Sequence, residues 1–367
     1  MKQNPNIKYG EIKMKTKLFL PIFFITFMLP LLFCGCNYGG DDDDYIPIYQ
    51  DAIYIMDEDG SNKQKVIDVD NCDNVQFIPN SNKLLYIADN SLYTVNEDGS
   101  DNMKISGELN VRRDLPAISD DEEKIAFAVY YDSRDYIYDL YMTEPTGNEL
   151  SNLTNSANIS EKEATFIQYQ NQEFLLYVTY FNMNETNFST LCIMDIINYH
   201  IDTLYVEEIE SSSFYGGFSY PIYINNQDKL FSSFGEWEEN LIMYNQLFNG
   251  IKETIFTGSF LNPIERSFTE NKIFFNPAQI HCYNYENDEI YSLIKGYRYY
   301  CSPISNILVY CSSISSNDGD IFTMQSDGAN NTKIIDEGFA PRFSLNGDKI
   351  VYVGKYVTNP KRNLLTN

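Results

Sequence analysis

The residues of this 367-residue chain that could carry acid–base or metal chemistry are few and widely separated. There are two histidines, His200 and His281, and each stands alone in a segment rich in Tyr and Asn. Two imidazoles can complete a metal site with carboxylates, but several ligands must then converge. Nothing in their spacing indicates convergence. We therefore expect both histidines at the surface or at strand edges, and we predict no metal site, no cofactor and no catalytic residue.

Other polar motifs that could do chemistry are equally isolated. The chain has seven arginines, scattered along the sequence, and one tryptophan, Trp237. The aromatic and acidic segment FGEWEEN (234–240) is the one loop that we expect to serve as a contact site. Adjacent carboxylates are common in a chain with 52 acidic residues, and we assign these pairs to loops without a catalytic role: Glu207-Glu208, Glu238-Glu239 and Asp120-Asp121.

Two classes of function are disfavoured by motif and charge. A serine hydrolase of the α/β type needs a G-x-S-x-G nucleophile turn, and the sequence has none. The formal net charge is −26, and a chain without residues 1–35 keeps 21 basic and 51 acidic residues. Such an acidic surface repels phosphate backbones, so nucleic acid is excluded as a partner.

The N-terminus has the pattern of a secretory signal. Lys15 and Lys17 precede the uncharged segment Leu18–Phe33, which is short for a membrane-spanning helix. We assign residues 1–35 to a signal peptide, and Met14 is a possible true start because MKTKLFL begins the basic region directly.

The end of this signal resembles a bacterial lipobox. Gly35 stands immediately before Cys36 and apolar Phe33 stands three residues before it. The resemblance implies that Cys36 is diacylated and becomes the new N-terminus. The alternatives are lipidation at Cys34, which bulky Phe33 would obstruct, and an ordinary secretory signal with an incidental cysteine.

An acidic stretch follows the cysteine. Asp41–Asp44 are four consecutive carboxylates that repel one another and cannot pack, so we predict a solvated tether over residues 36–50. The run also resembles the acidic export signal of surface lipoproteins of Bacteroidetes-type bacteria, and a plain linker explains it equally well. We expect attachment to the outer membrane, and the sequence leaves the periplasmic and outer faces open.

Five further cysteines are widely spaced and contain no C-x-x-C pair: Cys72, Cys192, Cys282, Cys301 and Cys311. Some of them can oxidise in a periplasmic environment, but the sequence defines no pairing.

The elements that must position these side chains form a repeat. Seven apolar runs each follow a turn, and their fourth apolar positions are 35 to 55 residues apart. This spacing is typical of four-stranded propeller blades, and consecutive apolar residues indicate burial on both faces. The seven runs are 82–88, 123–129, 173–179, 228–234, 271–276, 306–311 and 348–353, with fourth positions Tyr86, Phe127, Tyr177, Ser232, Phe275, Tyr310 and Tyr352.

A second hairpin follows each run and explains the chain ends. Segments 52–67, 91–105 and 320–335 are nearly superimposable, with Asp-Gly turns at Gly60, Gly99 and Gly328, and 136–154 is a looser copy. The first copy lacks a preceding hairpin and the last run lacks a following one. We therefore predict an all-β, seven-bladed propeller of four-stranded antiparallel blades over 51–357, followed by a tail at 358–367. Segments 52–57 and 349–354 should pair and close the ring.

The repeat resembles that of the TolB-type propellers. The matching residues are Pro341–Gly347, Ile125-Ala126-Phe127 and Ile53–Gly60. The resemblance covers most of residues 45–357 and fades between about 180 and 296, where the blade count is least secure. It implies a binding protein, a prolyl-peptidase propeller or a lyase, and lyases of this architecture share a His-based metal site.

Function is predicted less firmly than fold. Our first expectation is a non-enzymatic, membrane-tethered binding propeller, monomeric, that recognises a protein or glycan of the cell envelope. Segments 130–137, 180–190 and 211–220 depart most from the repeat and should form its variable surface. The alternative is a polysaccharide lyase or glycoside hydrolase with carboxylates and one histidine in the central channel.

Overall fold

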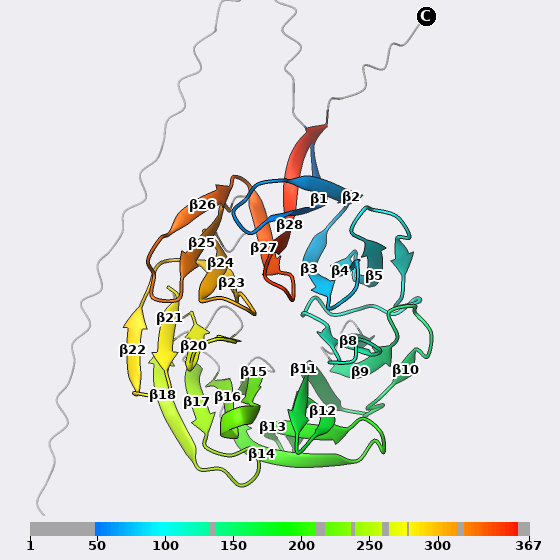
Figure 1. Ribbon diagram of the computed structural model, residues 1–367. Helices are drawn as coiled ribbons and strands as arrows, with labels where there is room; N and C mark the ends of the chain where they lie inside the picture. Colours follow the sequence, from blue (N-terminus) through cyan, green and yellow to red (C-terminus); the bar gives the residue numbers. More distant parts are fainter. Residues whose placement is uncertain are drawn as a thin grey trace, which may run out of the picture. The chain divides into compact units, whose positions relative to one another are not determined.

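A computed structural model describes residues 48–132, 137–209, 217–235, 239–258, 264–276, 279–313 and 319–358. These residues form seven four-stranded antiparallel sheets arranged in a ring (Figure 1). The prediction of an all-β, seven-bladed propeller is confirmed, including the count between 180 and 296. The predicted signal peptide, Cys36 and Asp41–Asp44 lie outside the described residues.

Each blade is given from its innermost to its outermost strand, as ordered in the sheets. Blade 1 has β27 (Gly338–Phe343), β28 (Lys349–Thr358), β1 (Ile48–Asp57) and β2 (Gln64–Val69). Blade 2 has β3 (Cys72–Ile78), β4 (Lys83–Ala88), β5 (Ser91–Asn96) and β6 (Met103–Lys104). Blade 3 has β7 (Ala117–Ile118), β8 (Ile125–Asp132), β9 (Ile137–Thr143) and β10 (Ser151–Asn152).

The remaining blades follow in chain order. Blade 4 has β11 (Ile159–Tyr169), β12 (Gln172–Met183), β13 (Thr186–Asp195) and β14 (Ile201–Ile209). Blade 5 has β15 (Gly217–Ile224), β16 (Lys229–Gly235), β17 (Glu239–Tyr244) and β18 (Lys252–Gly258), with the short helix η1 (Asn225–Gln227) after β15. Blade 6 has β19 (Glu265–Arg266), β20 (Lys272–Phe275), β21 (His281–Asn284) and β22 (Glu289–Ser292). Blade 7 has β23 (Tyr297–Cys301), β24 (Ile307–Cys311), β25 (Ile321–Gln325) and β26 (Thr332–Ile335).

All seven apolar runs form the second strands of the blades: β4, β8, β12, β16, β20, β24 and β28. Their side chains are buried on both faces, as in β28, where Ile350, Val351, Tyr352 and Val353 are each 0% exposed. Six hydrophobic clusters contain side chains from neighbouring blades. The core is therefore divided among the blade interfaces, and each blade is stabilised by its two neighbours.

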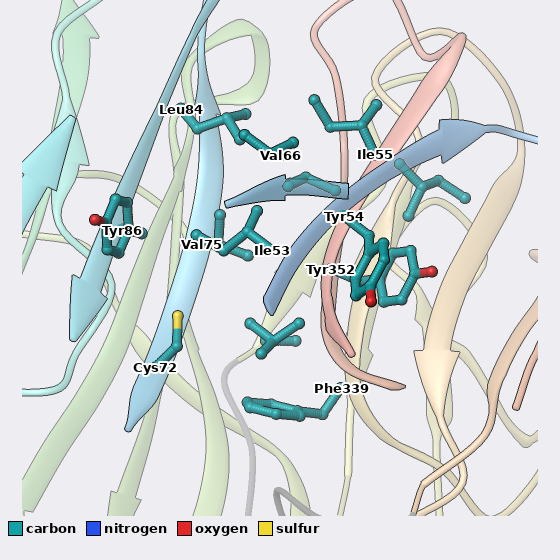
Figure 2. Packing of buried hydrophobic residues seen from close by; sticks show 14 of the residues in the cluster. Ile53, Tyr54, Ile55, Val66, Cys72, Val75, Leu84, Tyr86, Phe339 and Tyr352 are labelled. Atoms are coloured by element: carbon teal, nitrogen blue, oxygen red, sulfur yellow. The ribbon is translucent and has the colours of Figure 1, made fainter. Parts of the chain in front are cut away.

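The ring closes through the two ends of the propeller. β1 and β28 pair antiparallel from Ile48 opposite Thr358 to Asp57 opposite Lys349, which includes the predicted pairing of 52–57 with 349–354. The rings of Tyr54 and Tyr352 stack across this pair with centroids 5.5 Å apart (Figure 2). Backbone pairing and aromatic packing together hold the first and last strands in one sheet.

The Asp-Gly turns have the predicted geometry and a further role. Gly60, Gly99 and Gly328 have φ of +85°, +84° and +87°, which an L residue rarely adopts. A Cβ on Gly99 would lie 2.2 Å from the carbonyl oxygen of Val66 in β2 of blade 1. The turn of one blade therefore packs against the outermost strand of the preceding blade, and glycine is needed there for space as well as for φ.

The cysteines lie in the blades, and the predicted variable segments are only partly described. The five described cysteines are buried and unpaired. Burial raises the pKa of the Cys282 thiol to about 11, which keeps it protonated. Segment 180–190 forms the hairpin that joins β12 and β13, whereas residues 133–136 of 130–137 and residues 211–216 of 211–220 lie outside the described residues. Among the helices of the described ranges, none has the length and apolarity to cross a bilayer.

Candidate functional site

The innermost strands of all seven blades surround one cavity with a volume of about 640 Å³. These strands are β3, β7, β11, β15, β19, β23 and β27. Those labelled in Figure 1, β3, β11, β15, β23 and β27, lie around the centre of the ring. We call this cavity the central channel. Its size is within the range of small-ligand sites, about 300–1,000 Å³.

Four arginines line the central channel. Arg113 precedes β7, Arg266 lies in β19, Arg298 in β23 and Arg342 in β27. The described ranges contain five arginines, and the fifth, Arg112, is next to Arg113 in the chain. The interpretation that the arginines are scattered and isolated from one another is therefore wrong for these four, which lie around one cavity. They are distant in sequence, but the ring places the innermost strands of different blades face to face.

One pair of these arginines holds the acid Asp73. The Arg113 Nε lies 3.5 Å from Asp73 Oδ2, and Arg298 donates a hydrogen bond to the Asp73 backbone carbonyl at 3.1 Å. Burial raises the pKa of Asp73, and both guanidinium groups oppose that shift. Asp73 thus balances part of the positive charge at this side of the channel.

The second pair flanks Glu265. Burial raises the pKa of Glu265 to about 7, against the opposing fields of Arg342 and then Arg266. A glutamate that is about half protonated at pH 7 cannot fully balance two guanidinium groups. Asp120 also lines the channel and acts on Arg266, so two guanidinium groups face one carboxylate and one half-protonated glutamate, and this part of the channel keeps a small excess of positive charge although the whole chain is strongly acidic.

Protein contacts orient both of these guanidinium groups. The Arg342 guanidinium carbon lies 3.4 Å from the centre of the Tyr300 ring. Arg266 donates to the Tyr223 carbonyl at 3.2 Å, and its guanidinium carbon lies 4.8 Å from the centre of the Phe268 ring. The buried Nε of Arg342 has no hydrogen-bond partner in the described part of the chain. A guanidinium group has five N–H donors, so oriented arginines of this kind can bind carboxylates or phosphates.

Glu163, another acid that lines the channel, has its negative charge balanced by neighbouring cations of the protein. Burial raises the pKa of Glu163, but Lys162 at 3.0 Å and Arg112 at 3.9 Å outweigh it, so that the net shift is downward. Glu163 also accepts a hydrogen bond from the Tyr220 backbone N–H at 2.7 Å. This buried network ties β11 to β15 and has a structural role.

A repeated β-bulge directs side chains into the channel. The pairing of the innermost strand with the second strand shifts register at 162–165 in β11, 219–222 in β15, 297–300 in β23 and 339–342 in β27. Within these bulges Glu163, Tyr220, Arg298 and Ala340 have φ near +50°. Such a backbone costs about 1–3 kcal/mol for a residue other than glycine, and bulges of this kind re-aim side chains next to functional sites. The first three of these residues line the channel.

The two histidines lie in different blades. His200 lies in the turn before β14, its side chain is 72% exposed, and its Nε2 is 3.3 Å from Asp202. His281 lies in β21, the third strand of blade 6, where it stacks on Phe275 with centroids 5.4 Å apart. Neither lines the central channel. Within the described ranges, no group of three or more His, Cys, Asp or Glu could hold a metal ion.

The acidic pairs divide between loops and strands. Asp120-Asp121 lies in the turn after β7, as predicted, and Asp120 lines the channel. Glu207-Glu208 lies in strand β14, so the loop assignment was wrong; Glu207 accepts a hydrogen bond from Lys252 at 2.5 Å. Glu239 begins β17, whereas Trp237 and Glu238 lie outside the described residues, and with them the centre of the predicted contact loop 234–240.

Comparisons with known proteins identify the fold. No family model and no curated protein matches the sequence. An oligogalacturonate lyase from Vibrio parahaemolyticus is 11% identical with a TM-score of 0.58, and the match covers 84% of this chain and 97% of that one. An oligogalacturonate lyase in complex with manganese is 10% identical with a TM-score of 0.57, covering 84% and 91%. A protein from Agrobacterium tumefaciens assigned as TolB is 14% identical with a TM-score of 0.49, covering 84% and 99%.

The two lyase structures show the propeller fold and nothing finer. The seven-bladed propeller that the TolB-like repeat predicts is present. One fold can host many functions, so the chemistry of the channel decides.

Proposed function

We propose that this protein is a non-enzymatic binding propeller of the bacterial cell envelope that receives a protein or glycan partner in its central channel. The observation that carries the proposal is the convergence of Arg113, Arg266, Arg298 and Arg342 on one cavity. Seven blades that bury their strands against one another form a rigid support for such a site. The lipobox-like sequence ending at Cys36 supports a lipid anchor in the outer membrane.

A blocked channel tests this proposal. Thr165 of β11 lines the channel, and Thr332 of β26 is exposed on the outermost strand of blade 7. Partners captured from envelope extracts should be retained by Thr332→Trp and lost by Thr165→Trp, with thermal unfolding used to confirm that both variants fold. A partner that both variants retain equally would place the binding surface outside the channel.

One observation favours the alternative function, a polysaccharide lyase or glycoside hydrolase. Glu265, with a pKa of about 7 and two adjacent arginines, has the properties of a general base that works near neutral pH. The histidine that this alternative included in the channel is absent from its lining residues. Turnover of acidic or neutral glycans that is lost in Glu265→Gln would establish the enzyme and overturn the binding proposal.

A further inference from the structure

We propose that the ligand of the central channel is a carboxylated sugar, whose carboxylate binds between Arg266 and Arg342 beside Glu265. This inference rests on the proposed function, because it names the chemical class that the channel receives.

The charge at this position selects an anion. Arg266 and Arg342 both act on Glu265, and they lie on strands of different blades, β19 and β27. Guanidinium groups bind carboxylates through paired N–H donors. Arg342 is stacked on Tyr300 and Arg266 is held by the Tyr223 carbonyl, so neither needs to be ordered when a ligand arrives. A neutral ligand would leave this excess charge without a partner.

The channel wall offers surfaces suited to a sugar ring. Tyr220 and Phe268 also line the channel, where Tyr220 is half-buried and Phe268 is 52% exposed. Aromatic side chains provide flat apolar faces next to polar groups, which is the combination that a pyranose presents in return. The volume of about 640 Å³ suits a short oligosaccharide and is too small for a folded domain.

The innermost strands disfavour an extended peptide. A peptide that adds to a sheet edge needs a regular row of N–H and C=O groups. The bulges at Glu163, Tyr220, Arg298 and Ala340 interrupt the innermost strands of four blades. Side chains, not a continuous backbone edge, are therefore what these strands present to a ligand, and this favours the sugar.

Binding should strengthen as the pH falls. The groups that face Glu265 are Arg266 on its own strand, Arg342 on β27, and Tyr299, Tyr300 and Cys301 on β23. Burial raises the pKa of each of these three β23 side chains, so they stay neutral near pH 7. As the pH falls below 7 a growing fraction of Glu265 becomes neutral and stops competing with the ligand carboxylate for the two arginines, which leaves Asp120 as the acid that acts on Arg266.

The test is calorimetric titration of the purified protein with three probes: trigalacturonate, the same trisaccharide with its carboxylates reduced to alcohols, and triglutamate. We expect trigalacturonate to bind about 10-fold or more tightly than the reduced sugar and than the peptide. Arg342→Gln should weaken it by about 10- to 100-fold, and Arg342→Lys, which keeps the charge but loses the planar fork, should also weaken it. Lys104→Gln, which removes one positive charge from exposed β6, should change affinity less than about twofold.

The pH series supplies an independent readout. Affinity of the wild type for trigalacturonate should rise from pH 8 to pH 6, and Glu265→Gln should bind with an affinity that is flat over this range. Tighter binding of triglutamate or equal binding of the reduced sugar would overturn the inference and leave a binding channel in place. No binding of any probe, or an affinity unaffected by Arg342→Gln in a variant that unfolds normally, would also overturn it.

Discussion

Replacing the buried acid Glu161 by glutamine should change how stability depends on pH. Glu161 lies in β11 at the interface with β9, and it is 2% exposed. Burial and then the nearby Asp139 raise its pKa to about 8, although Ser156 and Thr154 oppose the shift by hydrogen bonding. Asp139 is also 2% exposed and accepts a hydrogen bond from Asn152 at 2.7 Å. The folded protein therefore keeps Glu161 protonated at neutral pH.

The sign and size of the effect follow from linkage. In the unfolded chain the glutamate ionises near its ordinary pKa of 4.5, while in the folded protein it stays protonated up to about 8. Between these values the unfolded state binds fewer protons, so stability falls as the pH rises. One pKa unit corresponds to about 1.4 kcal/mol, which gives a loss of about 4–5 kcal/mol across the whole window. Below pH 4.5 both states are protonated and the contribution is fully present.

The assay is urea unfolding of wild type and Glu161→Gln at pH 5, 6, 7 and 8. Glutamine does not titrate, so the stability of the variant minus that of the wild type should increase by about 1.4 kcal/mol per pH unit. Glu265, whose pKa is raised to about 7, acts in both proteins and cancels in this difference. Glu185→Gln, at an exposed turn, serves as the control and should track the wild type. A difference that stays constant from pH 5 to 8 would refute a protonated Glu161.

Three further perturbations test the fold and its anchor. Gly328→Ala should cost about 1–2 kcal/mol for its φ alone, and Gly99→Ala clearly more, because its Cβ would also overlap Val66; equal losses in urea unfolding would contradict the role of the turn in blade packing. Tyr352→Ala should lose about 3–5 kcal/mol of stability, whereas Tyr352→Phe should be neutral or stabilising, because the buried hydroxyl has no partner in the described part of the chain. Cys36→Ala should move the protein from the membrane to the soluble fraction, and mass spectrometry of the wild type should find a diacylated peptide starting at Cys36; a membrane-bound variant would exclude lipidation there.

The sequence predicted the fold because the repeat is written in residues with strong local preferences. Apolar runs, Asp-Gly turns and the unmatched chain ends were enough to place every second strand and the β1–β28 closure. The weak segment 180–296 still gave the correct count, because its second strands keep the apolar pattern even where Ser232 replaces the usual aromatic. Such patterns survive substitution because burial depends on polarity and volume more than on identity.

The channel was not predicted, because convergence is a property of the closed ring. Arg113 and Arg342 are more than two hundred positions apart, and no spacing rule for local motifs connects them. The sequence did contain one signal, which is the position of each residue relative to the fourth apolar position of its repeat. Tyr220, Arg298 and Ala340 each stand twelve residues before the fourth apolar position of their blade, namely Ser232, Tyr310 and Tyr352. Superimposing the repeats on this position would have shown which residues share one level of the innermost strands.

The constant position of the bulge within the repeat also suggests how a propeller can change its ligand without changing its fold. The bulge in β11, β15, β23 and β27 lies opposite Tyr177, Ser232, Tyr310 and Tyr352, the fourth apolar positions of the second strands. The buried side of the bulge is thus fixed by blade packing, whereas the residue with positive φ is an acid, a tyrosine, an arginine or an alanine. Glu163 is tied into a buried ion-pair network, but a side chain at this position that has no such partners can be exchanged at little cost to the core. We infer that the side chains of the innermost strands that line the channel, among them Arg266, Arg298 and Arg342, determine what the channel accepts, and that the second strands determine that there is a channel.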